Sequence, residues 1–451
     1  MTHPRNFTVA ALLLTTLVGC LPEERITWSP DGRRAAVATP GGLYFIDDSG
    51  KVLTPRLTGT PTRCDWFADS GRLAVVHTTK AANWKDIAEL FDAPQTKEIQ
   101  RQAEALRERV LAYDGEWSKF NLDPARQLSP EMQLGALIYM RDHDAEGVPE
   151  KLGDEWKKIQ EMEIAVWTLQ IFSLEEEALS AGKVLVRSLA ELRQPRVCPK
   201  GRHIAYLKTG SAENDSALLL HVVSADGERT LSAASNVAID FDWSPDGASL
   251  AYIQAAATDE GKENIHLGSL STATVVSTDG RLLAEPVARE DRVGLLFNGA
   301  LGVRWLRDGR LLFSSVEVCL PATSRDMPQE WTMFVLDPRM PASVSRVLGR
   351  DFDEPRDLAL PLFSLSPDEK RVLIPGTQGR LSLYEFASGS TVELVHADEG
   401  GGKTRLLPSW RGNDEFTFAS GDQVYQWKAG QRKALSEDWP TEMREGWLTD
   451  K

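Results

Sequence analysis

Short apolar runs recur along the chain, and each follows a turn built from Trp, Ser, Pro, Asp and Gly. The two clearest turns are 28–32, before an apolar run over 35–38, and 243–247, before a run over 250–253. Five weaker copies begin at Trp66, Val197, Trp305, Leu365 and Trp410. A unit that recurs at this spacing is typical of a β-propeller, because each blade buries its faces only against its neighbours. We therefore predict an all-β fold, a seven-bladed β-propeller.

The turns separate the expected strands of each blade. In the first repeat, the four strands are expected at 25–28, 34–38, 43–46 and 51–57. Asp accepts hydrogen bonds from the backbone just after it and Gly tolerates positive φ, so both suit a hairpin turn. We interpret the acids of these turns as turn formers, and not as catalytic acids or metal ligands: Asp31, Asp246, Asp308 and Asp368. The repeated Trp is interpreted as packing between neighbouring blades.

The repeats resemble the TolB-type propeller family, a WD-type repeat family in which Trp-Ser-Pro-Asp-Gly precedes an apolar strand. The resemblance covers 25–436 apart from one insertion. That family includes periplasmic interaction modules and the propeller domains of prolyl oligopeptidase-like hydrolases, so the resemblance implies a fold rather than an activity. The sequence contains no Gly-x-Ser-x-Gly nucleophile elbow, and we expect no hydrolase domain after the last blade.

Helical spacing replaces the strand pattern between the second and third strands of the second blade. Helices with apolar residues on one face are expected over 95–113, 129–140 and 150–161. Ser129 and Pro130 suit the N-cap and the first position of the second of these helices. The strand pattern resumes at 165–173. We therefore predict an α-helical insertion over 80–163 within blade two.

The insertion should emerge on the face of the propeller opposite the Asp-Gly turns, which we call the cap face. Other long segments are expected on this face at 208–217, 254–264, 278–302, 315–331 and 349–361. Long loops on a rigid scaffold tend to carry binding, which favours the cap face as the interaction surface. The alternative is that the insertion packs down without a binding role.

The N-terminal segment predicts secretion and a lipid anchor. Arg5 precedes an apolar stretch over 7–17 that is too short to span a bilayer. The box at 17–20, Leu-Val-Gly-Cys, resembles that of bacterial lipoproteins, in which the cysteine becomes the acylated first residue. We therefore predict a signal peptide over 1–19 and lipidation at Cys20. An ordinary secretory signal with a chance cysteine is the alternative.

The mature chain is expected to comprise a propeller over 20–436 and a C-terminal tail over 437–451. Leu21 resembles the outer-membrane sorting pattern of lipoproteins. This implies a protein of the bacterial cell envelope, anchored in the outer membrane and facing the periplasm if the cell is a diderm. The net charge of −15 disfavours non-specific binding to nucleic acid or anionic lipid. Membrane contact is therefore expected through the lipid anchor only.

Three cysteines remain besides Cys20, namely Cys64, Cys198 and Cys319. Cys64 and Cys198 lie near the inner strands of blades that adjoin in sequence. A disulfide between them is one hypothesis, and buried free thiols are the other.

Three patterns that suggest a cofactor or a metal carry weak signals. Residues 397–404 satisfy a loose phosphate-loop pattern, but Pro408 follows too soon for the helix that such a loop opens. Residues 142–147 begin like a calcium loop, yet Gly153 stands where the closing Glu belongs. The histidines that could approach the cap face come from three different blades: His77, His266 and His396. We therefore predict no cofactor and no bound metal.

These observations predict a non-catalytic scaffold that binds a protein partner of the envelope through its cap face. Two alternatives stay open. One is a propeller enzyme of the polysaccharide-lyase or hydrolase type with its site at the channel mouth, and the other is a ligand sensor with a helical lid. Three or more His, Glu or Gln side chains converging at the mouth would favour the enzyme, whereas an apolar, aromatic cap surface would favour a protein partner. The sequence identifies no small-molecule ligand.

Overall fold

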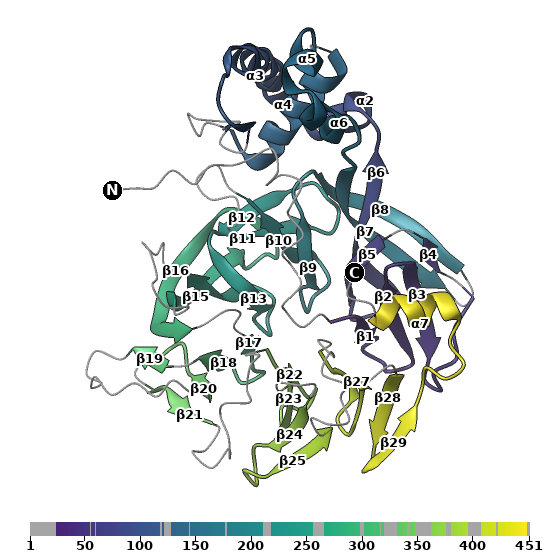
Figure 1. Ribbon diagram of the computed structural model, residues 1–451. Helices are drawn as coiled ribbons and strands as arrows, with labels where there is room; N and C mark the ends of the chain where they lie inside the picture. Colours follow the sequence, from purple (N-terminus) through teal and green to yellow (C-terminus); the bar gives the residue numbers. More distant parts are fainter. Residues whose placement is uncertain are drawn as a thin grey trace.

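The computed structural model of the protein describes residues 24–54, 56–58, 60–117, 120, 128–143, 145–175, 178–210, 218–255, 266–297, 302–315, 317–319, 332–340, 343–347, 362–375, 380–395, 407–420 and 423–448. Within these ranges, seven antiparallel sheets form a ring (Figure 1). The fold is a seven-bladed β-propeller with an α-helical insertion in blade two, which confirms the predicted fold class.

The first three blades contain four strands each, in sequence order. Blade one consists of β1 (Ile26–Trp28), β2 (Arg34–Thr39), β3 (Gly42–Asp47) and β4 (Leu57–Thr58). Blade two consists of β5 (Thr60–Trp66), β6 (Arg72–Ala81), β7 (Ile164–Glu175) and β8 (Ala178–Ser188). Blade three consists of β9 (Leu192–Val197), β10 (His203–Thr209), β11 (Leu218–Ser224) and β12 (Thr230–Ala234).

Blade four has an extra strand, and the last three blades return to four. Blade four consists of β13 (Val237–Trp243), β14 (Ser249–Ala255), β15 (His266–Val276), β16 (Leu282–Phe297) and β19 (Glu317–Cys319). Blade five consists of β17 (Val303–Trp305), β18 (Leu311–Ser315), β20 (Thr332–Leu336) and β21 (Ser345–Arg346). Blade six consists of β22 (Ser364–Leu365), β23 (Arg371–Pro375), β24 (Leu381–Glu385) and β25 (Thr391–Val395). Blade seven consists of β26 (Ser409–Gly412), β27 (Glu415–Ser420), β28 (Gln423–Lys428) and β29 (Gln431–Ala434).

The outer edge of blade four differs from the sequence prediction. Residues 278–302 do not form a long loop, because β16 occupies most of this stretch and pairs with β15. The strand β19, which lies between two strands of blade five in the sequence, pairs with the other edge of β16. The pattern of apolar residues does not indicate β16, because the middle of this strand consists of exposed and mostly charged residues, as is common in outer strands.

The outer strand of blade one is also shorter than predicted. It covers Leu57–Thr58 rather than 51–57. Before it, Val52 forms an isolated bridge with Ile46, and Leu53 N donates to Phe45 O at 2.8 Å.

The repeat turns are closed by hydrogen bonds within each turn. In the first, Ser29 Oγ donates to Asp31 Oδ1 at 2.6 Å, and the Arg33 amide donates to the same oxygen at 3.1 Å. Gly32 takes a φ of +68°, which a residue with a side chain rarely adopts. The other turn acids also accept hydrogen bonds from within their own turns: Asp246, Asp308 and Asp368. Their interpretation as turn formers is confirmed.

The repeat Trp side chains join neighbouring blades. Their indole N–H groups donate to the preceding blade in four places: Trp66 to Thr27 O (2.8 Å), Trp243 to Arg196 O (3.0 Å), Trp410 to Ser364 O (2.9 Å) and Trp28 to Thr417 Oγ1 of blade seven (3.2 Å). Packing between blades is therefore confirmed, and each bond adds a directional link to it.

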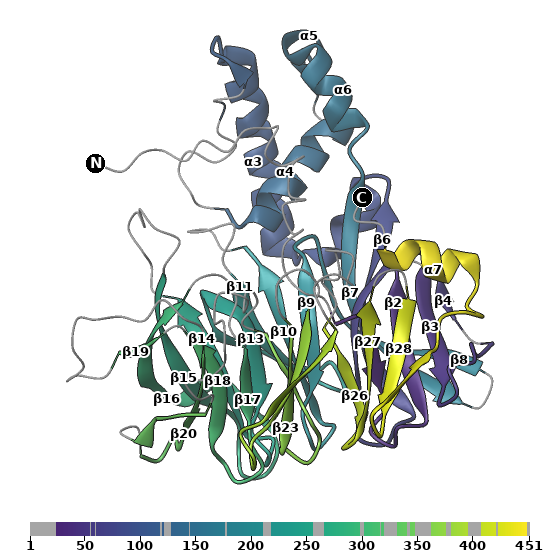
Figure 2. The same cartoon turned by 60° about the horizontal axis from the view of Figure 1, so that its bottom comes forward.

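The helical insertion lies between β6 and β7 and stands on the cap face (Figure 2). It consists of α2 (Trp84–Ile87), η1 (Ala88–Leu90), α3 (Ala93–Ala112), α4 (Pro130–His143), α5 (Val148–Leu152) and α6 (Asp154–Gln160). The third predicted helix is divided in two at Gly153, which takes a φ of +57°. The helices pack around an apolar core of their own, which includes Ile99, Leu106, Ile138 and Trp156. Among the described helices, none combines the length and the apolar character needed to cross a membrane.

Within the described ranges, blades one and seven share no strand, and other contacts join them. After β29 the chain forms α7 (Thr441–Leu448), inside the segment predicted as a tail. Trp439 and Met443 are buried in the apolar cluster of blade one, and Trp439 Nε1 donates to Gly50 O at 2.9 Å. The C-terminal segment thus packs across the junction between the first and last blades.

Candidate functional site

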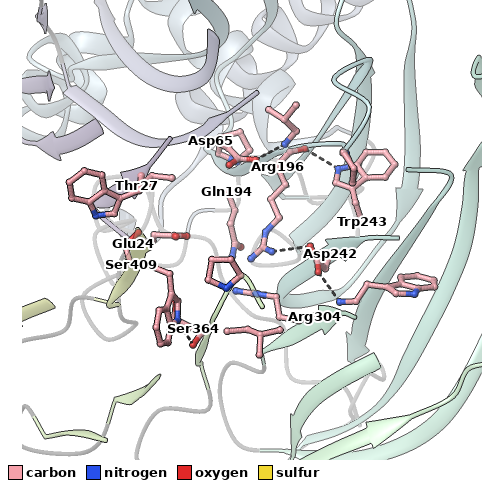
Figure 3. Close-up of a pocket in the computed structure, with 18 of the residues that line it drawn as sticks. Glu24, Thr27, Asp65, Gln194, Arg196, Asp242, Trp243, Arg304, Ser364 and Ser409 are labelled. Carbon is pink, nitrogen blue, oxygen red and sulfur yellow. Dashed lines mark hydrogen bonds and ion pairs between the residues drawn. The ribbon is translucent and has the colours of Figure 1, made fainter. Parts of the chain in front are cut away.

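A cavity of about 640 Å³ lies at the centre of the ring, and all seven blades line it (Figure 3). The lining comes from the innermost strands and the turns that follow them, together with Glu24 just before β1. Polar groups dominate its wall, because the innermost strands carry charged and hydroxyl side chains here. The central channel is therefore a concave site to which every blade contributes polar groups, and we take it as a candidate functional site.

One position of the repeat lines the channel in every blade, namely the residue just before the repeat Trp or its substitute. We call this set the pre-Trp ring: Thr27, Asp65, Arg196, Asp242, Arg304, Ser364 and Ser409. Successive side chains of a strand point to opposite faces. The Trp therefore reaches the preceding blade, while the residue before it can reach the channel and the following blade. The ring is charged in blades two to five and carries small hydroxyls in blades six, seven and one (Figure 3).

The two arginines of the pre-Trp ring, Arg196 and Arg304, meet at Asp240, whose side chain is 1% exposed. Asp240 Oδ1 accepts from Arg196 Nη2 at 2.7 Å, and its Oδ2 accepts from Arg304 Nη1 at 2.6 Å. Gln194 Nε2 donates a further bond of 3.1 Å, and Arg196 Nη1 reaches Asp242 at 3.3 Å. Two guanidinium groups thus compensate one buried carboxylate, which is the condition under which a charge can be kept inside a protein.

The same acids also link the backbones of successive blades. Asp65 Oδ2 accepts from Val197 N of blade three at 2.7 Å. From blade four, Asp242 Oδ2 accepts from Trp305 N at 2.8 Å, and Asp240 Oδ2 accepts from Val303 N at 3.0 Å. Each inner strand has a free edge at the channel, so these carboxylates satisfy amides that no neighbouring strand can reach. The acids of the channel wall therefore hold the ring together.

Burial changes the protonation of the channel groups. It raises the pKa of Asp65 to about 7, although the bond from Val197 N and the charge of Arg196 favour the carboxylate. Burial likewise raises the pKa of Asp242. Burial, reinforced by the charge of Asp65, raises the pKa of Cys64 to about 12. Asp65 is thus a channel group that titrates near neutral pH, whereas Cys64 stays a protonated thiol.

The cysteines do not follow the disulfide hypothesis. Cys64 in β5 and Cys198 just after β9 are both free thiols, the first half-buried and the second buried. Cys319 ends β19. Cys20, the predicted lipidation site, lies outside the described residues.

Of the three predicted histidines, the structure describes only the side chain of His77, which does not line the channel. His77 in β6 contacts Gln170 Oε1 at 3.2 Å, and burial lowers its pKa. His266 begins β15, and His396 lies outside the described residues. No His lines the cavity, and within the described ranges no three His, Cys, Asp or Glu side chains gather as metal ligands.

The calcium-like segment at 142–147 is described in part, and the phosphate-loop pattern at 397–404 is not described. Asp142 of the calcium-like segment accepts from Trp84 N at 2.6 Å and from Arg141 Nε at 2.7 Å, so its carboxylate ties the end of α4 to the start of α2. Asp144 of that segment and the phosphate-loop pattern at 397–404 lie outside the described residues.

The pre-Trp ring is the feature that sequence reasoning missed. The repeat itself contained the signal, because aligning the seven turns places these residues in one column. That column alternates Asp, Arg, Asp and Arg over blades two to five, an order that is visible without a structure.

The chain matches no protein-family model and no curated protein. Among solved structures, it is similar to the β-propeller domain of the trilobed protease from Pyrococcus furiosus, with 13% identity, 60% of this chain and 74% of that chain covered, and a TM-score of 0.37. TolB from Acinetobacter baumannii shows 15% identity over 59% of this chain and 58% of that chain, with a TM-score of 0.36. Oligogalacturonate lyase from Vibrio parahaemolyticus shows 13% identity over 78% of this chain and 73% of that chain, with a TM-score of 0.38. At these identities the likeness concerns the fold alone.

Proposed function

We propose that this protein is a non-catalytic interaction scaffold of the bacterial cell envelope, and that its helical insertion supplies the surface for a protein partner. One observation carries the proposal. The insertion is a compact unit with an apolar core, continuous in sequence with the propeller through β6 and β7 and raised above the cap face. Such a unit adds surface to the propeller without being needed to complete a blade, because β6 and β7 already pair with each other.

The channel wall supports a scaffold role in a second way. Its carboxylates accept hydrogen bonds from backbone amides of the next blade. Asp65 accepts one from Val197 N, and Asp242 accepts one from Trp305 N. Groups used in this way make the ring rigid, and a rigid ring is a suitable base for a protruding binding surface.

Excision of 84–161, with the ends joined by a short flexible linker, tests the proposal. The ends belong to one hairpin, since Ala81 pairs with Ile164, so the propeller should keep its cooperative β-sheet melting transition. Partner capture by the mature protein from its own envelope should fall by about tenfold or more, as expected when the central anchors of an interface are removed. Glu228→Gln, an exposed position in the turn between β11 and β12 and outside the insertion, is the control. Undiminished capture by a folded, excised protein would refute the proposal.

We further propose that lipidation of Cys20 anchors the protein to the membrane, in the outer membrane facing the periplasm if the cell is a diderm. Cys20 lies six residues before the start of β1 at Ile26, so the anchor would adjoin the propeller directly. Cys20→Ser should move the protein from the membrane to the soluble fraction and leave its melting transition unchanged. A mutant that remained membrane-bound would exclude this anchor.

One observation favours a second candidate, an enzyme that acts in the channel. Asp65 lines the central cavity, and its pKa, raised by burial to about 7, suits a group that exchanges protons at neutral pH. Turnover of an oligosaccharide panel by the purified protein, lost in a folded Asp65→Asn variant, would establish this function in place of the scaffold.

A further inference from the structure

The first turn of α4 is the part of the insertion that meets blade three. Ser129 Oγ accepts from Met132 N at 3.4 Å, which caps the helix, and Pro130 is its first residue. Pro130 lies against Gly210, just after β10, so closely that a methyl group added at Gly210 would come within 2.9 Å of Pro130 Cγ. The helix end is therefore seated on blade three at a position where only glycine leaves room.

Glu131 makes the polar part of this contact. Its Oε1 accepts from Ser188 Oγ at 2.5 Å, from Leu189 N at 3.1 Å and from Ala190 N at 3.3 Å. Its Oε2 pairs with Lys208 Nζ of β10. The side chains of Glu131 and Lys208 are only 18% and 24% exposed. One carboxylate thus joins α4, the connection between blades two and three, and the second strand of blade three.

Among the described residues, two further links join the insertion to the propeller. The chain enters and leaves through a two-stranded ribbon, in which Thr79 to Ala81 pair with Ile164 to Val166. This ribbon extends beyond β5, whose pairing with β6 ends at Thr78. The apolar contact to the propeller is made by Val166 and Leu189, which contribute to the core of the insertion. A two-stranded ribbon can bend and twist, so it leaves the direction of the insertion open.

We propose that Glu131 is the positioning residue that sets the direction of the insertion relative to the propeller, and thereby the placement of the partner surface. The role in partner binding rests on the function proposed above, whereas the role in positioning does not. If this buried carboxylate leaves, Leu189 N and Lys208 Nζ lose the hydrogen bonds that it accepts from them. Ser188 Oγ and Ala190 N keep bonds within their own connection, since Ser188 Oγ donates to Ala190 O at 2.9 Å and Ala190 N donates to Ser188 Oγ at 3.0 Å. The insertion therefore stays in one orientation while Glu131 keeps these bonds.

A spin-label distance measurement tests the positioning. Labels are introduced at Glu108 on the exposed side of α3 and at Ser232 on the exposed side of β12. The full-length protein should give one narrow distance distribution. Glu131→Ala should lose the narrow peak and give a broad distribution, while hydrogen exchange in α3 stays unchanged and the amide of Leu189, which donates to Glu131, loses protection. Glu104→Gln should behave like the unaltered protein.

The outcomes separate the two proposals. A narrow distribution in Glu131→Ala would overturn the positioning role. If the insertion unfolds in that variant, the same distance measurement is made on Glu131→Gln and Lys208→Met. Each of these variants keeps part of the hydrogen-bond network around Glu131. Partial broadening in both supports the role, and a narrow peak in both overturns it. A broadened distribution with unchanged partner capture would support positioning by Glu131 and refute its role in partner binding, whereas the excised protein tests the insertion as the partner surface.

Discussion

The guanidinium of Arg411 in blade seven lies 5.1 Å from the ring centroid of Trp28 in blade one. Arg411 Nε also donates to Gly32 O at 2.8 Å, and Nη1 donates to Asp48 O at 3.1 Å. Only 15% of the Arg411 side chain is exposed. Since no strand is shared between the first and last blades, this single side chain is a main polar contact across the closing junction.

Arg411→Ala should weaken ring closure. Loss of the cation–π contact and of the charged hydrogen bonds should lower the free energy of unfolding by about 2–4 kcal/mol, measured by urea denaturation. Arg33→Ala is the control, because its side chain is 82% exposed and lies 4.0 Å from Asp31. Equal stabilities of the two variants would show that Arg411 does not hold the junction.

The Trp bonds between blades can be tested by a matched pair of substitutions. Trp243→Phe removes the indole bond to Arg196 O and should lower the free energy of unfolding by about 1–3 kcal/mol. Trp305 is half-buried, and its indole makes no hydrogen bond to the residues that the structure describes. Trp305→Phe should therefore cost less than about 1 kcal/mol. The expectation fails if Trp305→Phe is as destabilising as Trp243→Phe.

Gly210→Ala should separate the insertion from blade three. The added methyl group would lie 2.9 Å from Pro130 Cγ, at a backbone φ of +85°. Gly309→Ala is the matched control, because Gly309 has a φ of +87° and nothing within 4 Å of the added group. The backbone cost of about 1 kcal/mol is shared by both variants. Faster hydrogen exchange at the Leu189 amide, which donates to Glu131, is expected in Gly210→Ala alone, and its absence would contradict the seating described above.

His221 should make stability depend on pH. Burial, together with the charge of Lys208, lowers its pKa to about 4, and its Nε2 is buried without a partner among the described residues. The ordinary pKa of His is about 6.5, so the unfolded chain binds the proton first as the pH falls. Stability from neutral His221 is present above pH 6.5 and is lost as the pH falls toward 4.

His221→Phe keeps a ring to stack on Tyr206, which lies 5.5 Å away, and removes this titration. Between pH 7 and pH 5, the unfolding free energy of the unaltered protein should fall by about 2 kcal/mol more than that of the variant. The pKa of Glu131 is lowered, so its stabilisation is lost only at more acidic pH and does not disturb the comparison. Parallel pH profiles of the two proteins would show that His221 is not buried as a neutral group.

The insertion shows how far the sequence can predict this structure. The apolar spacing placed its helices well, because α3 and α4 bury one face each at positions such as Ile99 and Ile138. It did not reveal the contact of Glu131 with Lys208, because these residues are 77 positions apart and nothing local couples them. The strand β16 was missed for the opposite reason, since its pairing with β15 and β19 needs no apolar alternation in its exposed middle.

The sequence by itself determined the repeat turns and the seven blades, since Ser29 and Asp31 bond within two residues and such short contacts recur in each copy. Only the tertiary structure decided the polar wall of the channel and the closure of the ring. Asp65 meets Val197 across 132 positions, and Trp28 meets Thr417 across 389. The reason is that a repeat specifies how each blade folds, whereas the partners of its inner edge depend on where the closed ring places the neighbouring blades.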